Sequence, residues 1–337
     1  MSVSYYTGQP SARRAPAPID AYVTRWGRPN DPAGYIADPG LVDAVNVALV
    51  LGQPLLITGE PGTGKTQLAH SIAWELGFRP PLVFETKSTS TARDLFYTYD
   101  TVGRFHAAQT GDGSQRSVDY INYNAFGAAI LRASNEEEVA DALPEGFVHG
   151  GRQRSVVLID EVDKAPRDFP NDILNEVEDM YFKVPELKNR KFAADTDMRP
   201  ILILTSNSEK HLPDAFLRRC VYYHIPFPDR ERLIEIIESR IDRFGGDTKR
   251  APADRKLLDD ALGFFFELRQ PATGLRKSPA TAELLGWMAF LLEAGAKVDT
   301  MMSRQRTIIV SSLSALVKGA ADQAIAASML TKWMASH

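Results

Sequence analysis

The octapeptide GEPGTGKT at residues 59–66 follows a short apolar run and fits the pattern G-x-x-x-x-G-K-[ST], with Gly59, Gly64, Lys65 and Thr66 at its defined positions. Glycines at these positions let backbone N–H groups turn toward a phosphate, and a following helix presents its positive N-terminus to the same group. The lysine of this pattern reaches the β- and γ-phosphates, and the hydroxyl is a ligand for Mg²⁺. The pattern therefore predicts a binding site for a magnesium nucleotide.

The predicted nucleotide contacts extend over the whole loop and the first turn of the helix after it. They are Gly59, Glu60, Pro61, Gly62, Thr63, Gly64, Lys65, Thr66 and Gln67. The alternative is a chance match, which average residue usage allows in roughly one chain in a hundred of this length. The apolar run before the loop and the helical pattern after it supply the context that a functional loop requires.

A second cluster of chemistry-bearing residues lies at the end of VVLIDE, residues 156–161, where four apolar residues precede adjacent carboxylates. A parallel strand delivers such carboxylates to the carboxyl edge of its sheet. Asp160 is then a candidate ligand of Mg²⁺, and Glu161 a candidate base for an attacking water. Taken alone, the same pattern also describes a buried strand with a solvated end, so the prediction depends on the phosphate loop upstream.

Asn207 ends a third apolar run, ILILTSN, and we expect it at the same sheet edge. Its amide is a candidate for holding the lytic water or touching the γ-phosphate, although Asn is also common as a turn residue where strands end. Arg218 and Arg219 follow in DAFLRRC, at the end of a short helical pattern. A permanently charged guanidinium suits a finger that enters a neighbour's site, and surface salt bridges are the alternative.

Five short apolar runs have the length of buried parallel strands. They are Leu55–Thr58, Leu82–Glu85, Val156–Asp160, Ile201–Thr205 and Val221–Ile225. Helical patterns separate them, including 65–76 and 169–180, which favours an α/β fold with a parallel sheet covered on both faces. From about residue 229 only helical patterns follow, at 229–242, 253–269, 279–294 and 303–334.

These patterns predict three parts of the chain. Residues 1–39 are rich in Pro, Gly, Ala and Arg and form an extended arm, residues 40–227 form the α/β domain, and residues 228–337 form a helical domain. A first helix is expected from about 40 to 51, with Asp38 as its N-cap. Hairpin insertions are expected near 96–121 and 181–198. The aromatics of FYTYD in the first insertion either pack inside it or form an exposed grip.

Composition narrows the function classes. The 337 residues include 39 basic and 43 acidic side chains, so no global positive field favours a polyanion. The apolar stretch 41–58 is interrupted by polar residues and is too short to span a membrane, and the first thirty residues lack the apolar core of a signal peptide. A single cysteine, Cys220, fits a reducing cytoplasm, and the six histidines show no zinc-binding spacing.

Together the segments GEPGTGKT, VLIDEVDKAPRDFPNDILNEVED and LTSNSEKHLPDAFLRRC resemble AAA+ ATPases, most closely the MoxR-type and dynein-related branch. The resemblance covers about residues 40–335. It implies a three-layer α/β/α domain with a parallel five-stranded sheet, followed by a helical lid. It also implies ATP and Mg²⁺ as ligands, a hexameric ring, and hairpins in the two insertion segments.

The same resemblance assigns roles to single residues. Asn207 matches the residue called sensor 1, and Arg219 matches the arginine of the L-D-R-F segment of the family. Here that segment reads LRRC, with Arg218 in place of the acid, so either arginine is a candidate finger. The lid arginine of the family lies in an S-P-R context. This chain has LRKSPATAEL instead, where Arg276 or Lys277 is the candidate for contact with the γ-phosphate.

The resemblance favours a chaperone-like motor that remodels or matures a partner, since MoxR-type proteins commonly act with a protein that carries a von Willebrand factor type A domain. One alternative is the motor subunit of a nucleic-acid-processing or defence system, because related rings with such hairpins thread DNA. Another is a slow nucleotide-gated assembly switch. The adjacent carboxylates Asp160 and Glu161 argue against the switch, because they predict hydrolysis.

Overall fold

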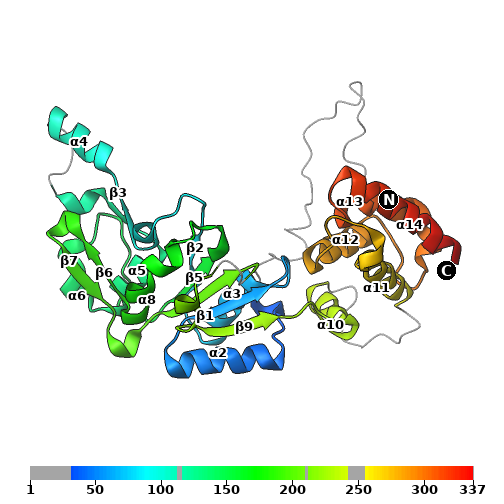
Figure 1. Cartoon of the computed structure of the whole chain (residues 1–337), viewed down its shortest axis with the longest axis horizontal. Coiled ribbons are helices and arrows are strands. Elements are labelled where there is room, and N and C mark those ends of the chain that lie inside the picture. Colours follow the sequence, from blue (N-terminus) through cyan, green and yellow to red (C-terminus); the bar gives the residue numbers. More distant parts are fainter. Residues whose placement is uncertain (1–31, 112–115, 209–211, 242–254, 337) are drawn as a thin grey trace. The chain divides into compact units, whose positions relative to one another are not determined.

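The computed structural model describes residues 32–111, 116–208, 212–241 and 255–336 (Figure 1). Most of the predicted N-terminal arm, residues 1–31, lies outside the described residues. The chain divides into two compact units. The first, the sheet unit, holds residues 37–60 and 64–226. The second, the helical unit, holds the described residues from 227 onward together with residues 32–36 and 61–63.

The sheet unit is built on a parallel five-stranded sheet. Its strands are β1 (Leu55–Gly59), β2 (Leu82–Glu85), β5 (Val156–Asp160), β8 (Ile201–Ser206) and β9 (Val221–Ile225). They lie in the order β2-β5-β8-β1-β9, and every neighbouring pair is parallel. The predicted fold class is thus confirmed. Because the strands are parallel, the residues that follow β1, β5 and β8 all lie at one edge of the sheet.

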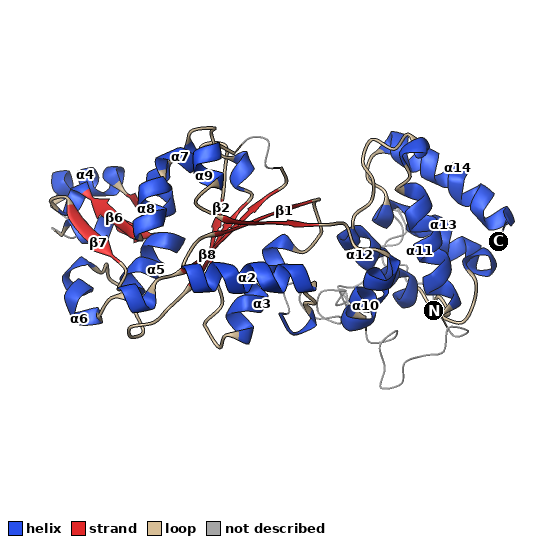
Figure 2. Ribbon diagram, turned by 60° about the horizontal axis from the view of Figure 1, so that its bottom comes forward, coloured by secondary structure: helices blue, strands red, loops and turns tan. Residues whose placement is uncertain are grey.

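Helices cover both faces of this sheet (Figure 2). On one face α2 (Pro39–Leu51) contacts β1 and β9, and α3 (Lys65–Glu75) contacts β1, β5 and β8. The helices elsewhere in this unit are α4 (Thr101–Thr110), α5 (Ala125–Ala133), α6 (Glu136–Val139), α7 (Phe169–Asp172), α8 (Leu174–Asp179) and α9 (Asp214–Leu217). The helix predicted over 169–180 is two helices, because Ile173 ends α7 before α8 begins.

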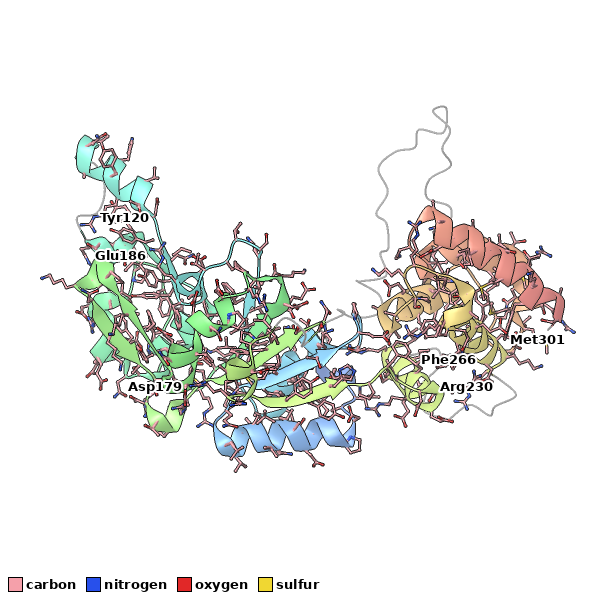
Figure 3. The ribbon with its side chains drawn as sticks, in the orientation of Figure 1. Tyr120, Asp179, Glu186, Arg230, Phe266 and Met301 are labelled. Carbon is pink, nitrogen blue, oxygen red and sulfur yellow. The ribbon has the colours of Figure 1, made fainter. Side chains whose placement is uncertain are left out.

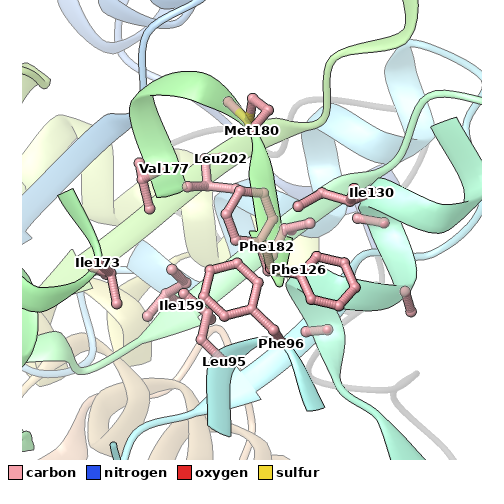
Figure 4. Close-up of a cluster of buried hydrophobic side chains, with 14 of the residues drawn as sticks. Leu95, Phe96, Phe126, Ile130, Ile159, Ile173, Val177, Met180, Phe182 and Leu202 are labelled. Carbon is pink, nitrogen blue, oxygen red and sulfur yellow. The ribbon is translucent and has the colours of Figure 1, made fainter. Parts of the chain in front are cut away.

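The main core of the sheet unit lies between the opposite face of the sheet and these later helices (Figure 4). Ile159 and Leu202 from the strands meet Phe126 from α5 and Val177 from α8, and all four are buried. Phe182 joins the cluster from the second insertion. Burial of each such side chain contributes about 1.5–3 kcal/mol, so the core fixes the two strands that carry the candidate site.

Both predicted insertions contain a pair of antiparallel strands. In the second, β6 (Tyr181–Val184) pairs with β7 (Arg190–Ala193). In the first, β3 (Tyr97–Tyr99) pairs with β4 (Ile121–Tyr123), but α4 lies between them in the sequence, so this insertion is more than a hairpin. In Figure 1, α4 projects from the β3 end of the unit.

The aromatic residues of the first insertion are packing residues. Phe96 and Tyr97 are 4% and 1% exposed, and the ring of Phe96 lies 5.4 Å from that of Phe182. The Tyr97 hydroxyl donates to the carboxylate of Glu186 at 2.8 Å, and Glu186 is labelled in Figure 3. An exposed aromatic grip is therefore wrong for these two residues.

The helical unit holds α10 (Arg230–Arg240), α11 (Lys256–Leu268), α12 (Thr281–Glu293), α13 (Arg306–Leu316) and α14 (Ala320–Ser336). The single helix predicted over 303–334 is wrong, because the chain breaks between α13 and α14 at Gly319, whose φ of 95° no right-handed helix accepts. Trp287 and Phe264 lie in the buried core of this unit. No helix in the described ranges has the length and apolarity to cross a membrane.

Candidate active site

The loop between β1 and α3 has the backbone that the glycine pattern predicts. Gly62 and Gly64 have φ values of 79° and 89°, in the left-handed region that glycine adopts without a side-chain clash. Gly64 is the N-cap of α3, and no side chain caps the helix there. The backbone N–H groups of the first turn, which begins with Lys65 and Thr66, therefore lie at the positive end of the helix, where an anion is favoured.

Lys65 is buried at the base of this loop, with 7% of its surface exposed. Its ammonium donates to the carbonyl oxygens of Gly59 at 2.8 Å and Glu60 at 3.0 Å, and to Asn207 Oδ1 at 3.0 Å. Desolvation lowers the pKa of Lys65, and nearby carboxylates led by Asp163 oppose that shift. The geometry thus holds a lysine charge between the loop and β8.

Thr66 and Asp160 meet at the edge of the sheet, from α3 and the end of β5. The Thr66 hydroxyl donates to Asp160 Oδ1 at 3.0 Å and lies 3.2 Å from Oδ2. A hydroxyl beside one carboxylate is the donor set that suits Mg²⁺, which is usually bound by one or two carboxylates together with phosphate oxygens and water. These two residues fit a magnesium ion carried by a nucleotide, as the sequence pattern predicts.

Glu161 follows in a backbone conformation that is uncommon for a residue with a side chain. Its φ and ψ are 54° and 52°, in the left-handed region. One carboxylate oxygen pairs with the ammonium of Lys164, and the other accepts a long hydrogen bond of 3.5 Å from Asn207 Nδ2. The side chain is 38% exposed, so its second oxygen can reach solvent beside the loop.

Asn207 connects the other predicted residues of the site. Its amide oxygen accepts from Lys65, its amide nitrogen donates to Glu161, and its backbone N–H donates to Asp163 Oδ1 at 3.3 Å. The structure therefore brings together Lys65, Thr66, Asp160, Glu161 and Asn207, which come from three sequence segments. This cluster lies entirely within the sheet unit.

Arg218 and Arg219 lie at the opposite edge of the same sheet. They precede β9, whose first residue Val221 pairs with Leu55 at the start of β1, whereas the phosphate loop follows the end of β1. A five-residue strand separates these ends by roughly 15 Å. Arg219 donates to Glu178 Oε2 at 2.8 Å and to the carbonyl oxygen of Ala215 at 3.0 Å. Neither arginine belongs to the cluster around Lys65.

A pocket of about 350 Å³ lies beside these arginines. It is lined at this end of the sheet unit by Arg199, Arg218, Arg219 and Glu178, together with residues that precede β1 and β9. Arg199 donates to the backbone carbonyl of Glu178 at 2.6 Å. The pocket thus has a surplus of positive charge, which suits an anionic group.

The lid candidates Arg276 and Lys277 lie in the helical unit, and both are exposed. Their backbone N–H groups donate to the two carboxylate oxygens of Asp322, at 3.1 and 3.0 Å. Asp322 is buried, with 4% of its surface exposed. This contact fixes the backbone of the segment and leaves both cationic side chains at the surface.

Three residues of the site were missed by the sequence reasoning. Thr205 donates to Asp160, Lys164 pairs with Glu161, and Asp163 accepts from the backbone of Asn207. Each lies within three residues of a predicted site residue. For Thr205 the sequence did contain a signal. It is the polar residue at the end of the otherwise apolar run ILILT, and a buried hydroxyl requires a hydrogen-bond partner.

Three features together define a P-loop nucleotide-binding protein. They are a glycine loop between a strand and a helix, the Asp160 carboxylate beside the Thr66 hydroxyl, and the Glu161 carboxylate that follows Asp160. The family model for the ATPase family associated with various cellular activities (AAA) matches residues 55–228, which is half of the chain. The chain belongs to this family of ATPases.

Curated relatives match part of the chain. It is 27% identical over 201 residues to the gas vesicle ATPase GvpN of Haloferax mediterranei, covering 58% of this chain and 53% of that protein. It is 26% identical over 199 residues to the ATP-dependent zinc metalloprotease FtsH of Nitrosococcus oceani, covering 50% of this chain and 28% of that protein. The chain thus spans between about a quarter and a half of the length of these relatives.

Among solved structures, the Holliday junction branch migration motor RuvB of Thermotoga maritima matches with a TM-score of 0.42 and 17% sequence identity. The match covers 84% of this chain and 69% of that chain.

Proposed function

We propose that this protein hydrolyses ATP at the edge of the sheet where β1, β5 and β8 end. The observation that carries the proposal is the convergence of five residues at this edge: Asn207 bonds both Lys65 and Glu161, and Thr66 bonds Asp160, which precedes Glu161. Family membership supports ATP as the nucleotide. No other arrangement in the described residues combines a phosphate loop with two adjacent carboxylates.

Each residue has a proposed role in the reaction. Backbone N–H groups in residues 59–67, other than Pro61, and the Lys65 ammonium bind the β- and γ-phosphates. Thr66 and Asp160 would hold Mg²⁺, which supplies charge neutralisation between the phosphates when bound. Glu161 accepts a proton from the attacking water, and Asn207 orients that water between Glu161 and the γ-phosphate.

The arginines at the other sheet edge require a neighbouring subunit in this proposal. Arg219 lies a full strand length from the phosphate loop of its own chain, so it serves as a finger only in the site of an adjacent copy. Glu178 holds its guanidinium in place. A ring, hexameric by resemblance to the AAA+ proteins, satisfies this geometry because head-to-tail contacts repeat around it. By the same resemblance, the lid residue Arg276 is the proposed second sensor.

The hydrolysis test compares the wild-type protein with the Lys65→Ala variant. We expect the wild type to release phosphate from ATP in the presence of Mg²⁺, and the variant to lose nucleotide binding, because Lys65 is the ammonium group that is held against the loop carbonyls. Phosphate release and the binding of a fluorescent ATP analogue are the measurements. A wild type that binds no nucleotide, or a variant that hydrolyses ATP at the wild-type rate, contradicts the proposal.

We further propose that the motor is a MoxR-type chaperone that remodels a protein partner bearing a von Willebrand factor type A domain. The motif resemblance supports this role, and the exposed helix α4, with Val102 79% and Phe105 64% exposed, supplies a surface for such a partner. The Glu161→Gln variant in ATP should retain the partner in a pull-down. Recovery of DNA, with ATPase activity stimulated by DNA and steeply weakened by salt, would instead favour a nucleic-acid motor.

A further inference from the structure

Thr205, the fifth residue of β8, joins the two carboxylate-bearing residues at the end of β5. Its hydroxyl donates to Asp160 Oδ1 at 2.5 Å and accepts from the backbone N–H of Glu161 at 2.8 Å. Thr205 is fully buried, with 0% of its surface exposed. A buried hydroxyl that donates once and accepts once has both of its hydrogen-bonding roles satisfied in one place.

The position of Thr205 follows from the pairing of β5 with β8. Ile159 pairs with Leu204, so the next residues along the two parallel strands, Asp160 and Thr205, lie side by side where the regular ladder ends. The side-chain hydroxyl continues the connection between the strands beyond the backbone pairing. It therefore fixes the orientation of the Asp160 carboxylate relative to the sheet.

The second hydrogen bond acts on the backbone of Glu161. A residue with a side chain adopts the left-handed conformation only where its surroundings hold it there, and Glu161 has a φ of 54°. Here the N–H of Glu161 points at the Thr205 hydroxyl, which leaves the carboxylate directed toward Asn207 and Lys164. The Thr205 hydroxyl thus orients Asp160, the candidate metal ligand, and also holds the backbone turn that presents Glu161, the candidate base.

We propose that Thr205 is a positioning residue that aligns Asp160 for Mg²⁺ and Glu161 for water, an inference that rests on the proposed ATPase function. The Thr66 hydroxyl also donates to Asp160, but it is itself a proposed metal ligand and must turn toward the ion. The Thr205 hydroxyl has no such second role, so it would keep the Asp160 carboxylate oriented when Mg²⁺ is bound. Supporting contacts of this kind typically change metal affinity or activity 10–100-fold when removed.

The test replaces Thr205 with valine, which keeps the shape and removes the hydroxyl, and with serine, which keeps the hydroxyl. Ser134→Ala is the matched control, since it removes a buried hydroxyl of the same unit that bonds only backbone carbonyls of Ile130 and Ala193. Binding of a fluorescent ADP analogue is titrated with Mg²⁺ and repeated in a metal chelator. Steady-state ATP hydrolysis then gives kcat and KM for each protein.

We expect Thr205→Val to need about ten times more Mg²⁺ for half-maximal nucleotide binding and to lose about 10–100-fold in kcat. Its affinity for the nucleotide in the chelator should equal that of the wild type, because the phosphate loop itself is unchanged. Thr205→Ser and Ser134→Ala should both remain close to wild type. Rescue by serine would show that the hydroxyl, and not the packing of the side chain, carries the effect.

Valine and wild-type proteins with the same Mg²⁺ dependence and kcat would overturn the inference, as would a serine variant as impaired as the valine variant. A loss of binding in the chelator would assign the effect to general damage and also overturn it. If the valine protein does not fold, as judged by circular dichroism, Thr205→Ala takes its place. A wild type that binds no magnesium nucleotide would instead refute the proposed function itself.

Discussion

At the scale of single residues, the site is a set of charges that hold one another in place. Lys65 is held by two loop carbonyls and Asn207, and Asp160 accepts from two hydroxyl groups. Electrostatic groups fixed before the reaction need little reorganisation when the phosphate charge develops. We therefore expect the rate of ATP hydrolysis to depend more on the arrangement of these side chains than on the pKa of each one.

A residue-scale prediction concerns Cys220, which precedes β9 and lines the pocket beside Arg218 and Arg219. Burial raises the pKa of its thiol to about 12. At pH 8 only on the order of 10⁻⁴ of such a thiol is thiolate, the form that reacts, whereas an unfolded cysteine with a pKa of about 8.5 is roughly one quarter thiolate. Alkylation by iodoacetamide should thus be at least about a hundredfold slower in the folded protein.

The raised pKa of Cys220 also sets how the stability of the folded protein depends on pH. Because the folded pKa is raised, the protonated thiol is favoured in the native state, and its contribution to stability falls as pH rises from about 9 to about 12. Mass spectrometry of the alkylated protein, with and without urea, measures the two rates. Equal rates at pH 8 would contradict the raised pKa of this partly buried thiol.

At the scale of elements, close packing between helix α5 and the first insertion leaves no room for a side chain at Gly127. A Cβ atom at Gly127, the third residue of α5, would lie 2.0 Å from the carbonyl oxygen of Phe96. Real Cβ atoms do not approach backbone oxygens so closely, so the helix or the insertion must move if the residue grows. The insertion is thereby coupled to the helix that packs on β2 and β5.

We predict that Gly127→Ala destabilises the sheet unit by about 2 kcal/mol, because overpacking costs about 1–3 kcal/mol and outweighs the better helix propensity of alanine. Gly286→Ala in α12 is the matched control, since its Cβ would meet nothing within 4 Å. That variant should gain up to about 1 kcal/mol. Urea unfolding followed by circular dichroism measures both, and a neutral Gly127→Ala would contradict the packing described.

Much of the element scale could be predicted from the sequence, for identifiable reasons. The inner strands β1, β5 and β8 are buried, nearly continuous apolar runs, and the outer strands β2 and β9 are apolar enough to be recognised although alternate residues are exposed. The polar ends of β5 and β8 placed Asp160 and Asn207 at one edge. The break at Gly319 was missed because a single glycine is tolerated inside helical patterns, and its left-handed backbone depends on packing. The role of Thr205 was missed because register between distant strands decides which side chains meet.

At the scale of the whole molecule, the residues proposed to bind the nucleotide and the arginines proposed as a finger lie at opposite edges of the sheet. The nucleotide cluster lies at the carboxyl edge, and Arg218 and Arg219 lie at the amino edge. In the proposed ring, a complete site combines the carboxyl edge of one copy with the amino edge of the next. This division predicts that ATP hydrolysis depends on assembly, since an arginine finger contributes about 10³–10⁵ in rate.

A mixing experiment tests this dependence. Arg219→Ala and Lys65→Ala should each be inactive alone, but random mixed rings should regain about a quarter of the active sites, where an intact loop meets an intact arginine. Arg218→Ala is the matched control. It should retain activity, because Arg219, held by Glu178, is the proposed finger. Mixed rings that form without any gain in phosphate release would argue against a finger supplied by a neighbour.

The most direct measurement of the central claim is single-turnover hydrolysis of ATP by the wild type and by Glu161→Gln, with nucleotide binding measured in parallel. The glutamine keeps the size of the side chain and its contact with Asn207 but cannot accept a proton. We predict equal binding and a loss of about 10²-fold or more in the hydrolysis rate. Equal rates for the two proteins would contradict the claim that this edge of the sheet is an ATP-hydrolysing site.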